Sequence, residues 1–248
     1  IFFVTANEGD ARDEEDAYIT NSGLHDIERL GKANIDASFS ELSTLKANEE
    51  MGRLKIVITE GDLDRDGDID RIHSFGGRSF SIWDAYGNLV FDSGDEFARA
   101  VADATPTLFN GGDKRSDDKG AEPEAIAVGK VAGRTYTFIG LERVSGILVY
   151  DVTNPYKAKL VQYINTQKDG DISPEGMKFI SEKKSPSGKA MLAVSYEVSG
   201  TVVLYSIDHL PKSTPDAVPL SAVVAVTLKE GTSSTNTIPS LVKSRVEA

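Results

Sequence analysis

One segment of the sequence occurs twice, and this repetition limits the folds that the chain can adopt. The first copy begins at Glu122–Ile126 and the second, 51 residues later, at Ser173–Met177. Each copy continues through a polar turn and a strand-like segment into a second turn, at Val144–Gly146 and at Val198–Gly200. A period of this length matches one four-stranded blade of a β-propeller. Two similar hairpins of a β-sandwich are the alternative, but the matched turns and strands favour the propeller.

Short segments with alternating apolar residues dominate the chain and predict an all-β fold. The expected strands are Leu54–Thr59, Ser79–Trp83, Leu89–Phe91, Tyr136–Leu141, Ile147–Val152, Leu160–Ile164, Met191–Ser195, Val202–Ile207 and Ala222–Leu228. Two short helices are expected in insertions, over Phe39–Glu50 and Glu96–Ala104. The sequence therefore predicts a four- to five-blade portion of a larger, seven-bladed ring.

The expected domain organisation is one partial propeller over residues 1–230, followed by a linker or tail over residues 231–248. The tail begins with the Ser- and Thr-rich stretch Gly231–Asn236. The chain opens on the apolar segment Ile1–Thr5, with neither a Met nor a signal peptide, so we expect a piece of a longer protein. Because an open arc of blades exposes sheet edges and apolar faces, the expected partners are the remaining blades, from missing sequence or a second chain.

The segment Asp62–Asp70 has the spacing of a calcium-binding loop, D-x-D-x-D-G-x-x-D. Ca²⁺ takes six to eight oxygen ligands, and a loop with a donor at every second residue can supply them. The helical EF-hand version does not fit, because His73 stands where that loop needs a bidentate Glu. The expected ligands are the side chains of Asp62, Asp64, Asp66 and Asp70 and the backbone carbonyl of Asp68. A solvated acidic turn is the alternative, but five aspartates in nine residues repel each other without a cation.

Composition excludes several classes of function. The net charge of −12 argues against nucleic acids and anionic membrane surfaces as partners, since both attract basic patches. The chain has no cysteine, which removes disulfides, thiolate zinc sites and cysteine nucleophiles. No apolar run approaches the roughly 20 residues that span a bilayer. A serine nucleophile elbow, a P-loop and a dinucleotide fingerprint are also missing from the sequence.

Several long motifs resemble those of the choice-of-anchor I family. They are Ala6–Arg12, Glu60–Asp62 leading into the aspartate loop, Ser74–Asp84, Arg115–Gly120 and the two Pro-Glu repeats. Members of this family carry LVIVD-type propeller repeats and include mesenchyme-specific cell-surface glycoproteins associated with biomineralisation. Many bacterial members are labelled alkaline phosphatase. The resemblance covers about residues 1–210 and implies a propeller that is secreted, periplasmic or at the cell surface, with a possible extracellular partner.

Glutamates recur at comparable positions of the strand pattern. They are Glu8, Glu60, Glu142 and Glu197, together with Glu124 and Glu175 at the start of the two repeats. Equivalent positions of successive blades point to one end of a propeller's central channel, so these carboxylates could form a ring that binds a cation or a phosphate-bridging metal. Alternatively, each glutamate pairs with a nearby arginine or caps a turn, and the sequence leaves both possibilities open.

Two further segments are candidates for a second metal or phosphate site. In the loop Asp113–Glu122, Arg115 and Lys119 could contact a phosphate while Asp117 or Asp118 holds a metal, or the charges could satisfy each other. The acidic segment Asn7–Asp16 could hold a second calcium ion through Glu8 and Asp10.

The sequence supports two functions. The first is a secreted or cell-surface calcium-binding propeller that serves as a binding or structural module. The second is a metal-dependent phosphoesterase, like an alkaline phosphatase or a phytase, that uses carboxylates at the channel mouth. The number of bound ions separates them: one isolated ion indicates the module, whereas two ions about 3.5–4 Å apart indicate hydrolysis.

Overall fold

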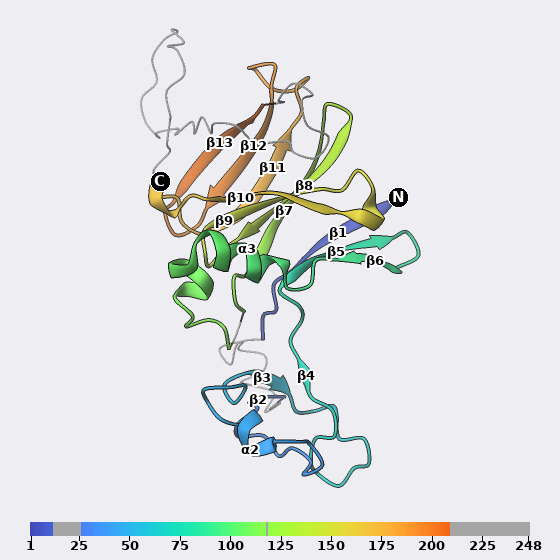
Figure 1. Ribbon diagram of the computed structural model, residues 1–248. Helices are drawn as coiled ribbons and strands as arrows, with labels where there is room; N and C mark the ends of the chain where they lie inside the picture. The colour runs from blue at the N-terminus through green and yellow to red at the C-terminus, as the bar shows by residue number, and fades with distance from the viewer. Residues whose placement is uncertain (12–25, 118, 209–248) are drawn as a thin grey trace, which may run out of the picture.

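The computed structural model describes residues 1–11, 26–117 and 119–208. Within these residues the chain forms four antiparallel sheets and few helices (Figure 1), so the prediction of an all-β chain is confirmed. Three sheets pack against one another and form what we call the main body. The fourth lies in residues 26–74, which we call the small unit, and Figure 1 shows it below the main body.

The central sheet of the main body contains the first copy of the repeat. Its strands β7 (Pro123–Val131), β8 (Arg134–Leu141), β9 (Gly146–Asp151) and β10 (Lys159–Asn165) each pair with the next in the chain. The two-residue turn between β7 and β8 has positive φ at both Ala132 (48°) and Gly133 (84°), the geometry that joins twisted strands tightly. Both faces of this sheet are covered, which explains why β9 is buried along its whole length.

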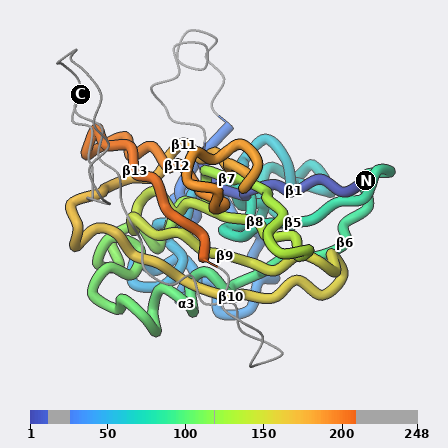
Figure 2. The backbone as a smooth tube through the Cα atoms, turned by 90° about the horizontal axis from the view of Figure 1, so that it is seen from above, coloured from blue at the N-terminus to red at the C-terminus, as the bar shows by residue number. Residues whose placement is uncertain are grey.

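The two flanking sheets have three strands each. The second copy of the repeat forms β11 (Pro174–Ile180), β12 (Ala190–Tyr196) and β13 (Thr201–Ile207). The third sheet consists of β1 (Phe2–Asn7), β5 (Ser79–Asp84) and β6 (Leu89–Asp92). The first strands of the three sheets are neighbours, because β7 contacts β11 on one side and β1 on the other (Figure 2).

Two apolar cores hold the three sheets together. Between the central and the second sheet, Phe138 stacks on Phe179 with ring centroids 6.2 Å apart. Between the central and the third sheet, Phe80 packs on Tyr150 with centroids 4.6 Å apart. Helix α3 (Glu96–Ala104) joins the second core through the fully buried Phe97. Apolar side chains on both faces of the central sheet therefore fix the order of the three sheets.

Gly129 on β7 allows the central and second sheets to approach closely, because a Cβ at this position would overlap the ring of Phe179. We expect Gly129→Ala to lower the free energy of unfolding by about 1–3 kcal/mol, the usual cost of overpacking a core. Urea denaturation measures the change. The same substitution in a Phe179→Leu background should cost much less, and an equal loss in both backgrounds would contradict the packing explanation.

The small unit has a core of its own. Its sheet contains β2 (Ile27–Arg29), β3 (Lys55–Val57) and β4 (His73–Ser74), and the short helix α2 (Leu42–Leu45) lies beside it. Apolar side chains from these elements and from the intervening loops pack together, among them the fully buried Leu30 and Ile56. The aspartate loop connects β3 to β4, so this core positions the loop.

The structure corrects some expected elements. The expected helix over Phe39–Glu50 is much shorter than predicted, since only α2 is α-helical there and Glu41 before it has a left-handed φ of 56°. The expected helix Glu96–Ala104 is confirmed as α3. Short 3₁₀ turns, which were not expected, cover Pro106–Gly111, Pro155–Lys157 and Gln167–Asp169. The expected strand Ala222–Leu228 and the tail over residues 231–248 lie outside the described residues.

Candidate functional site

The aspartate loop begins at Gly61, whose φ is 102° and where a Cβ would overlap the carbonyl oxygen of Arg71. That glycine's carbonyl accepts hydrogen bonds from the backbone of Asp70 (2.9 Å) and Arg71 (3.0 Å), which closes the loop. The carboxylate of Asp62 accepts three backbone N–H groups from inside the loop. These belong to Arg65 (2.6 Å), Asp66 (3.2 Å) and Gly67 (3.1 Å). The chain therefore wraps around the Asp62 side chain.

The fold brings the carboxylates of the loop into two groups that share Asp70. In the first, Asp62, Asp64 and Asp70 each offer an oxygen, and these oxygens lie within 4.8 Å of one another. In the second, Asp70 meets Asp68 and Asp36 within the same limit. All of these donors are carboxylate oxygens, the ligands that Ca²⁺ prefers. The residues present therefore fit a calcium ion.

Asp36 was not predicted from the sequence, because it lies far upstream of the loop. A parallel bridge between Ile35 and Ile69 places it there. The side chain of Asn34 supports this contact by donating a hydrogen bond to the carbonyl of Gly67 at 2.9 Å. Only the fold brings this segment to the loop, so no local motif could have identified Asp36.

The other two predicted ligands differ from expectation. Asp66 belongs to neither carboxylate group, and its side chain accepts the backbone N–H of Asp68 at 3.2 Å. Asp68, expected to act through its backbone carbonyl, instead contributes a carboxylate to the group with Asp36. One oxygen of this carboxylate, Oδ1, is buried and has no hydrogen-bond partner in the described part of the chain.

The carboxylates of this loop lie close together and repel one another. Partial desolvation and then the charges of Asp66 and Asp70 raise the pKa of Asp64. Desolvation and the neighbouring aspartates also raise the pKa of Asp68, to about 6. Among the described residues, no Lys or Arg forms an ion pair with the aspartates of this loop. A bound cation would relieve this repulsion.

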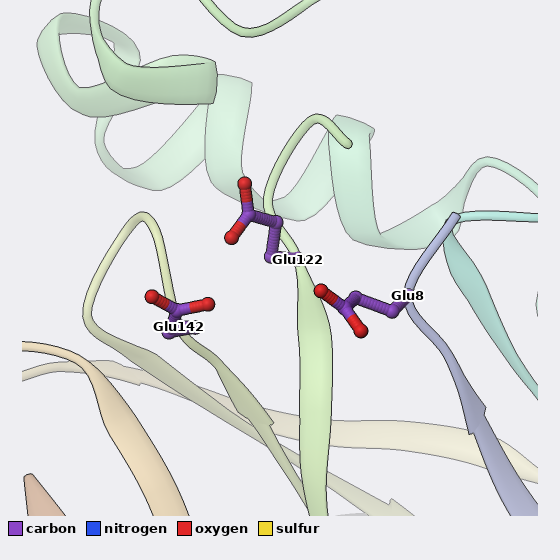
Figure 3. A group of neighbouring side chains, drawn as sticks. All are labelled: Glu8, Glu122 and Glu142. Atoms are coloured by element: carbon purple, nitrogen blue, oxygen red, sulfur yellow. The ribbon is translucent and has the colours of Figure 1, made fainter. Parts of the chain in front are cut away.

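A second group of carboxylates lies in the main body, where Glu8, Glu122 and Glu142 each offer an oxygen within 4.8 Å of the others (Figure 3). Glu8 follows β1, Glu122 precedes β7 and Glu142 follows β8. A backbone hydrogen bond from Glu142 to the carbonyl of Glu122 (2.8 Å) holds two of them together. We call these three residues the glutamate cluster.

Three cations accompany the glutamate cluster. Glu122 is fully buried and forms ion pairs with Arg115 (3.0 Å) and Arg143 (2.8 Å). Glu8 pairs with Lys119 at 3.1 Å. These cations offset much of the negative charge of the glutamate cluster, although Lys119 is shared with Asp10 at 3.4 Å.

Glu122 and Glu142 differ in how readily they ionise. Burial, followed by the hydrogen bond to Glu122 and its charge, raises the pKa of Glu142. Burial also acts to raise the pKa of Glu122, but hydrogen bonds from Arg143, Glu142 and Arg115 together lower it below its usual range. Glu122 is therefore the more acidic partner, and Glu142 holds its proton to a higher pH.

This difference predicts a pH-dependent effect of Glu142→Gln. Folding raises the pKa of Glu142. The contribution of this residue to the free energy of unfolding is therefore complete below the unfolded pKa of about 4.3, and it is lost as the pH rises through the folded pKa. Glutamine does not ionise, so the variant does not lose this part of the free energy of unfolding as the pH rises. We expect it to gain stability relative to the parent by about 1 kcal/mol or more between about pH 5 and pH 9, measured by urea denaturation. A difference that does not change with pH would contradict this account.

Of the glutamates that were expected to form a ring, Glu8 and Glu142 meet in the glutamate cluster. Burial, and then the charges of Glu8 and Glu175, raise the pKa of Glu124, and Glu197 contributes to the same effect. These side chains therefore lie close enough to interact. Glu60, in contrast, is exposed beyond the end of β3 in the small unit.

Glu122 was not predicted as a site residue from the sequence. Its one distinguishing signal was its position at the start of the first repeat copy, where the second copy has Ser173. Both residues have positive φ, 54° and 64°, which shows that they are structurally equivalent. The change from Ser to Glu makes the cluster specific to the first copy.

The loop Asp113–Glu122 pairs its charges both internally, through Arg115 and Glu122, and with other segments. Asp117 forms ion pairs with Arg53 (2.7 Å) and Arg29 (3.3 Å) of the small unit. Asp10 lies 3.4 Å from Lys119, the residue that also holds Glu8. Asp118 and the part of Asn7–Asp16 beyond residue 11 lie outside the described residues. In the described part of the chain, no helix is long and apolar enough to cross a membrane.

Known proteins share sequence with this chain over most of its length. Gigasin-3a from Magallana gigas is 30% identical over 229 aligned positions, which cover 79% of this chain and 80% of that protein. The mesenchyme-specific cell surface glycoprotein of Strongylocentrotus purpuratus is 29% identical over 162 positions, which cover 57% of this chain and 19% of the glycoprotein. This chain therefore spans about a fifth of the glycoprotein.

One solved structure, the C-terminal domain of Pseudomonas aeruginosa PilY1, matches 62% of this chain and 30% of the PilY1 chain, with 18% identity. The TM-score of this match is 0.34, which is too low to identify the fold. The family model of the choice-of-anchor I domain matches residues 1–155, more than half of the chain. The chain belongs to the choice-of-anchor I domain family.

Proposed function

We propose that this chain is an extracellular or cell-surface module that binds one Ca²⁺ in its aspartate loop. The observation that carries the proposal is the uncompensated group of Asp62, Asp64 and Asp70, whose oxygens lie within 4.8 Å of one another. Asp36 and Asp68 stand beside them and extend the set of oxygen donors. Since the loop joins two strands of the small unit, the ion's role is to stabilise that unit.

The proposed location rests on the relatives. The name of the Strongylocentrotus purpuratus relative places that protein at the cell surface. The acidic composition of this chain, with a net charge of −12, is compatible with such a location and with a divalent cation as ligand.

We further propose that the three sheets of the main body are consecutive blades of a propeller. Two observations support this: each sheet is antiparallel with its strands paired in chain order, the small unit being inserted between β1 and β5 of the third sheet, and the first strands β1, β7 and β11 are neighbours. In this arrangement the partners of the chain are the blades that complete the ring.

A metal-dependent phosphoesterase is the second candidate, and the convergence of Glu8, Glu122 and Glu142 favours it. The cations Arg115, Arg143 and Lys119 already form ion pairs with these carboxylates, so we place this function second. Two metal ions bound at the glutamate cluster, with hydrolysis of a phosphate ester, would reverse this order.

Calorimetric titration with Ca²⁺ tests the proposed function. We expect one site per chain, and we expect Asp64→Asn to weaken binding at least about tenfold, because a carboxylate is exchanged for a neutral amide. Asp64 is exposed, and within the described residues its side chain accepts one hydrogen bond, from the backbone of Asp66 at 3.3 Å, so the variant should fold.

Asp84→Asn is the matched control. The carboxylate of Asp84 also organises a turn, accepting the backbone N–H groups of Tyr86 (2.8 Å) and Asn88 (2.9 Å), but it belongs to no carboxylate group in the described residues. Its calcium affinity should equal that of the parent. Absence of binding by the parent chain would refute the proposal, as would equal affinities of Asp64→Asn and the parent.

A further inference from the structure

The last strand of the second sheet, β13, pairs on one side only in the described part of the chain. Its partner there is β12, so β13 is the outermost strand of its sheet (Figure 1). The backbone N–H and C=O groups along its other side form a row of donors and acceptors with which a further strand can pair. We call this side of the strand the β13 edge.

The β13 edge lacks the features that normally protect an outermost strand. Its sequence, Thr-Val-Val-Leu-Tyr-Ser-Ile, contains neither a charge nor a proline, and its seven residues pair with β12 in an unbroken register. The outermost strands of the other two sheets differ. β10 begins with Lys159 and its register with β9 is interrupted, and β6 has only four residues. A long, regular and apolar edge such as that of β13 pairs with other chains unless a segment covers it.

The first copy of the repeat indicates what covers this edge. Tyr150 on β9 and Tyr205 on β13 are equivalent, because each lies in the third strand of its copy and is buried against the preceding sheet. After β9 the chain makes the short turn Pro155–Lys157 and returns as β10, which pairs with β9 in the antiparallel direction. The second copy has no counterpart of β10 among the described residues. Its fourth strand is therefore expected in the sequence that follows β13.

One segment after β13 has the composition of such a strand. Ala222–Leu228, which lies outside the described residues, reads Ala-Val-Val-Ala-Val-Thr-Leu. It has the same length as β10, seven residues, and its four apolar or β-branched types are common in strands that pair on a half-buried surface. Residues 208–221 separate it from β13 and leave enough chain to reverse direction.

We propose that Ala222–Leu228 is the fourth strand of the second sheet and pairs antiparallel with the β13 edge. The equivalence with β10 also predicts the register. Gln162, the fourth residue of β10, lies opposite Val149, the residue before Tyr150. The fourth residue of the proposed strand, Ala225, therefore lies opposite Leu204, the residue before Tyr205. The proposal does not depend on calcium binding, because the β13 edge and the aspartate loop share no residue.

Disulfide formation in the full chain tests this pairing. The chain has no cysteine, so a pair of introduced cysteines reports on one contact. Side chains that lie opposite each other in antiparallel strands are close enough for a disulfide. We expect Leu204→Cys with Ala225→Cys to form a bond within one chain when oxidised glutathione is added, as measured by mass spectrometry of a digest.

Leu204→Cys with Ser234→Cys is the matched control. Ser234 lies nine positions beyond Ala225, in the Ser- and Thr-rich stretch, and the entropy of closing a loop rises only slowly with its length. The control pair should form its disulfide at least about fivefold more slowly than the Leu204–Ala225 pair.

Hydrogen exchange tests the same pairing without cysteines. Val224→Pro removes a backbone donor from the proposed strand, and we expect the amides of β13 to exchange about tenfold faster or more. Ser234→Pro should leave their exchange unchanged, and circular dichroism checks that both variants fold. Three results would overturn the proposal: equal rates of disulfide formation in the two pairs, disulfides only between two chains, which would assign the β13 edge to a second copy, or β13 amides that do not respond to Val224→Pro.

Discussion

Replacement of Glu122 by Gln is expected to lower the free energy of unfolding by about 2–3 kcal/mol, one of the two largest effects predicted for this chain. The Glu122 carboxylate is fully buried and accepts hydrogen bonds from Arg115 (3.0 Å) and Arg143 (2.8 Å). The neutral amide removes the ion-pair partner of Arg115 and leaves Arg143 with its longer ion pair to Glu142 (3.3 Å). The loss is smaller than the 3–5 kcal/mol of a fully buried pair, because water reaches the arginines, which are 35% and 36% exposed.

Urea denaturation at neutral pH measures this effect, with Glu8→Gln as the matched control. Glu8 belongs to the same glutamate cluster, but it is 30% exposed and pairs with Lys119. Its replacement should cost less than about 1 kcal/mol, as for other solvent-exposed ion pairs. Equal losses for the two variants would show that Glu122 does not organise the cluster.

The second large effect is the stabilisation of the folded chain by calcium. A ligand at 100 times its dissociation constant stabilises the state that binds it by about 2.7 kcal/mol. We expect a gain of this size when denaturation in saturating Ca²⁺ is compared with denaturation in a chelator. The gain arises because the ion offsets the mutual repulsion of the carboxylates of Asp62, Asp64 and Asp70.

The gain should depend on the aspartate loop and on nothing else. Asp64→Asn should lose most of it, and Asp84→Asn should keep all of it. A gain that survives Asp64→Asn unchanged would assign the stabilising ion to another part of the chain.

The strands that were predicted correctly are those whose apolar alternation is local. Examples are β9, expected over Ile147–Val152 and observed over Gly146–Asp151, and β12, expected over Met191–Ser195 and observed over Ala190–Tyr196. The first strands of both repeat copies, β7 and β11, were not among the expected strands. Each begins with a proline that reads as a turn, although proline is tolerated at the first position of a strand.

The residues of the candidate sites also differ in whether they are close in sequence or brought together by long-range contacts. Asp62, Asp64 and Asp70 lie within nine residues, so their spacing alone predicts that they meet. Asp36 and Glu122 join their groups through long-range contacts, the Ile35–Ile69 bridge and the packing of β7 against β8. Sequence spacing carries no information about such contacts. For the same reason the sequence could not show that Arg115, Arg143 and Lys119 form ion pairs with the glutamate cluster.

The most direct test of the proposed function is the anomalous scattering of a crystal of this chain grown with calcium. The account predicts one calcium peak per chain, between the carboxylates of Asp62, Asp64 and Asp70 and next to Asp36 and Asp68. A map without a peak at the aspartate loop would contradict it, and so would a map whose calcium lies between Glu8, Glu122 and Glu142.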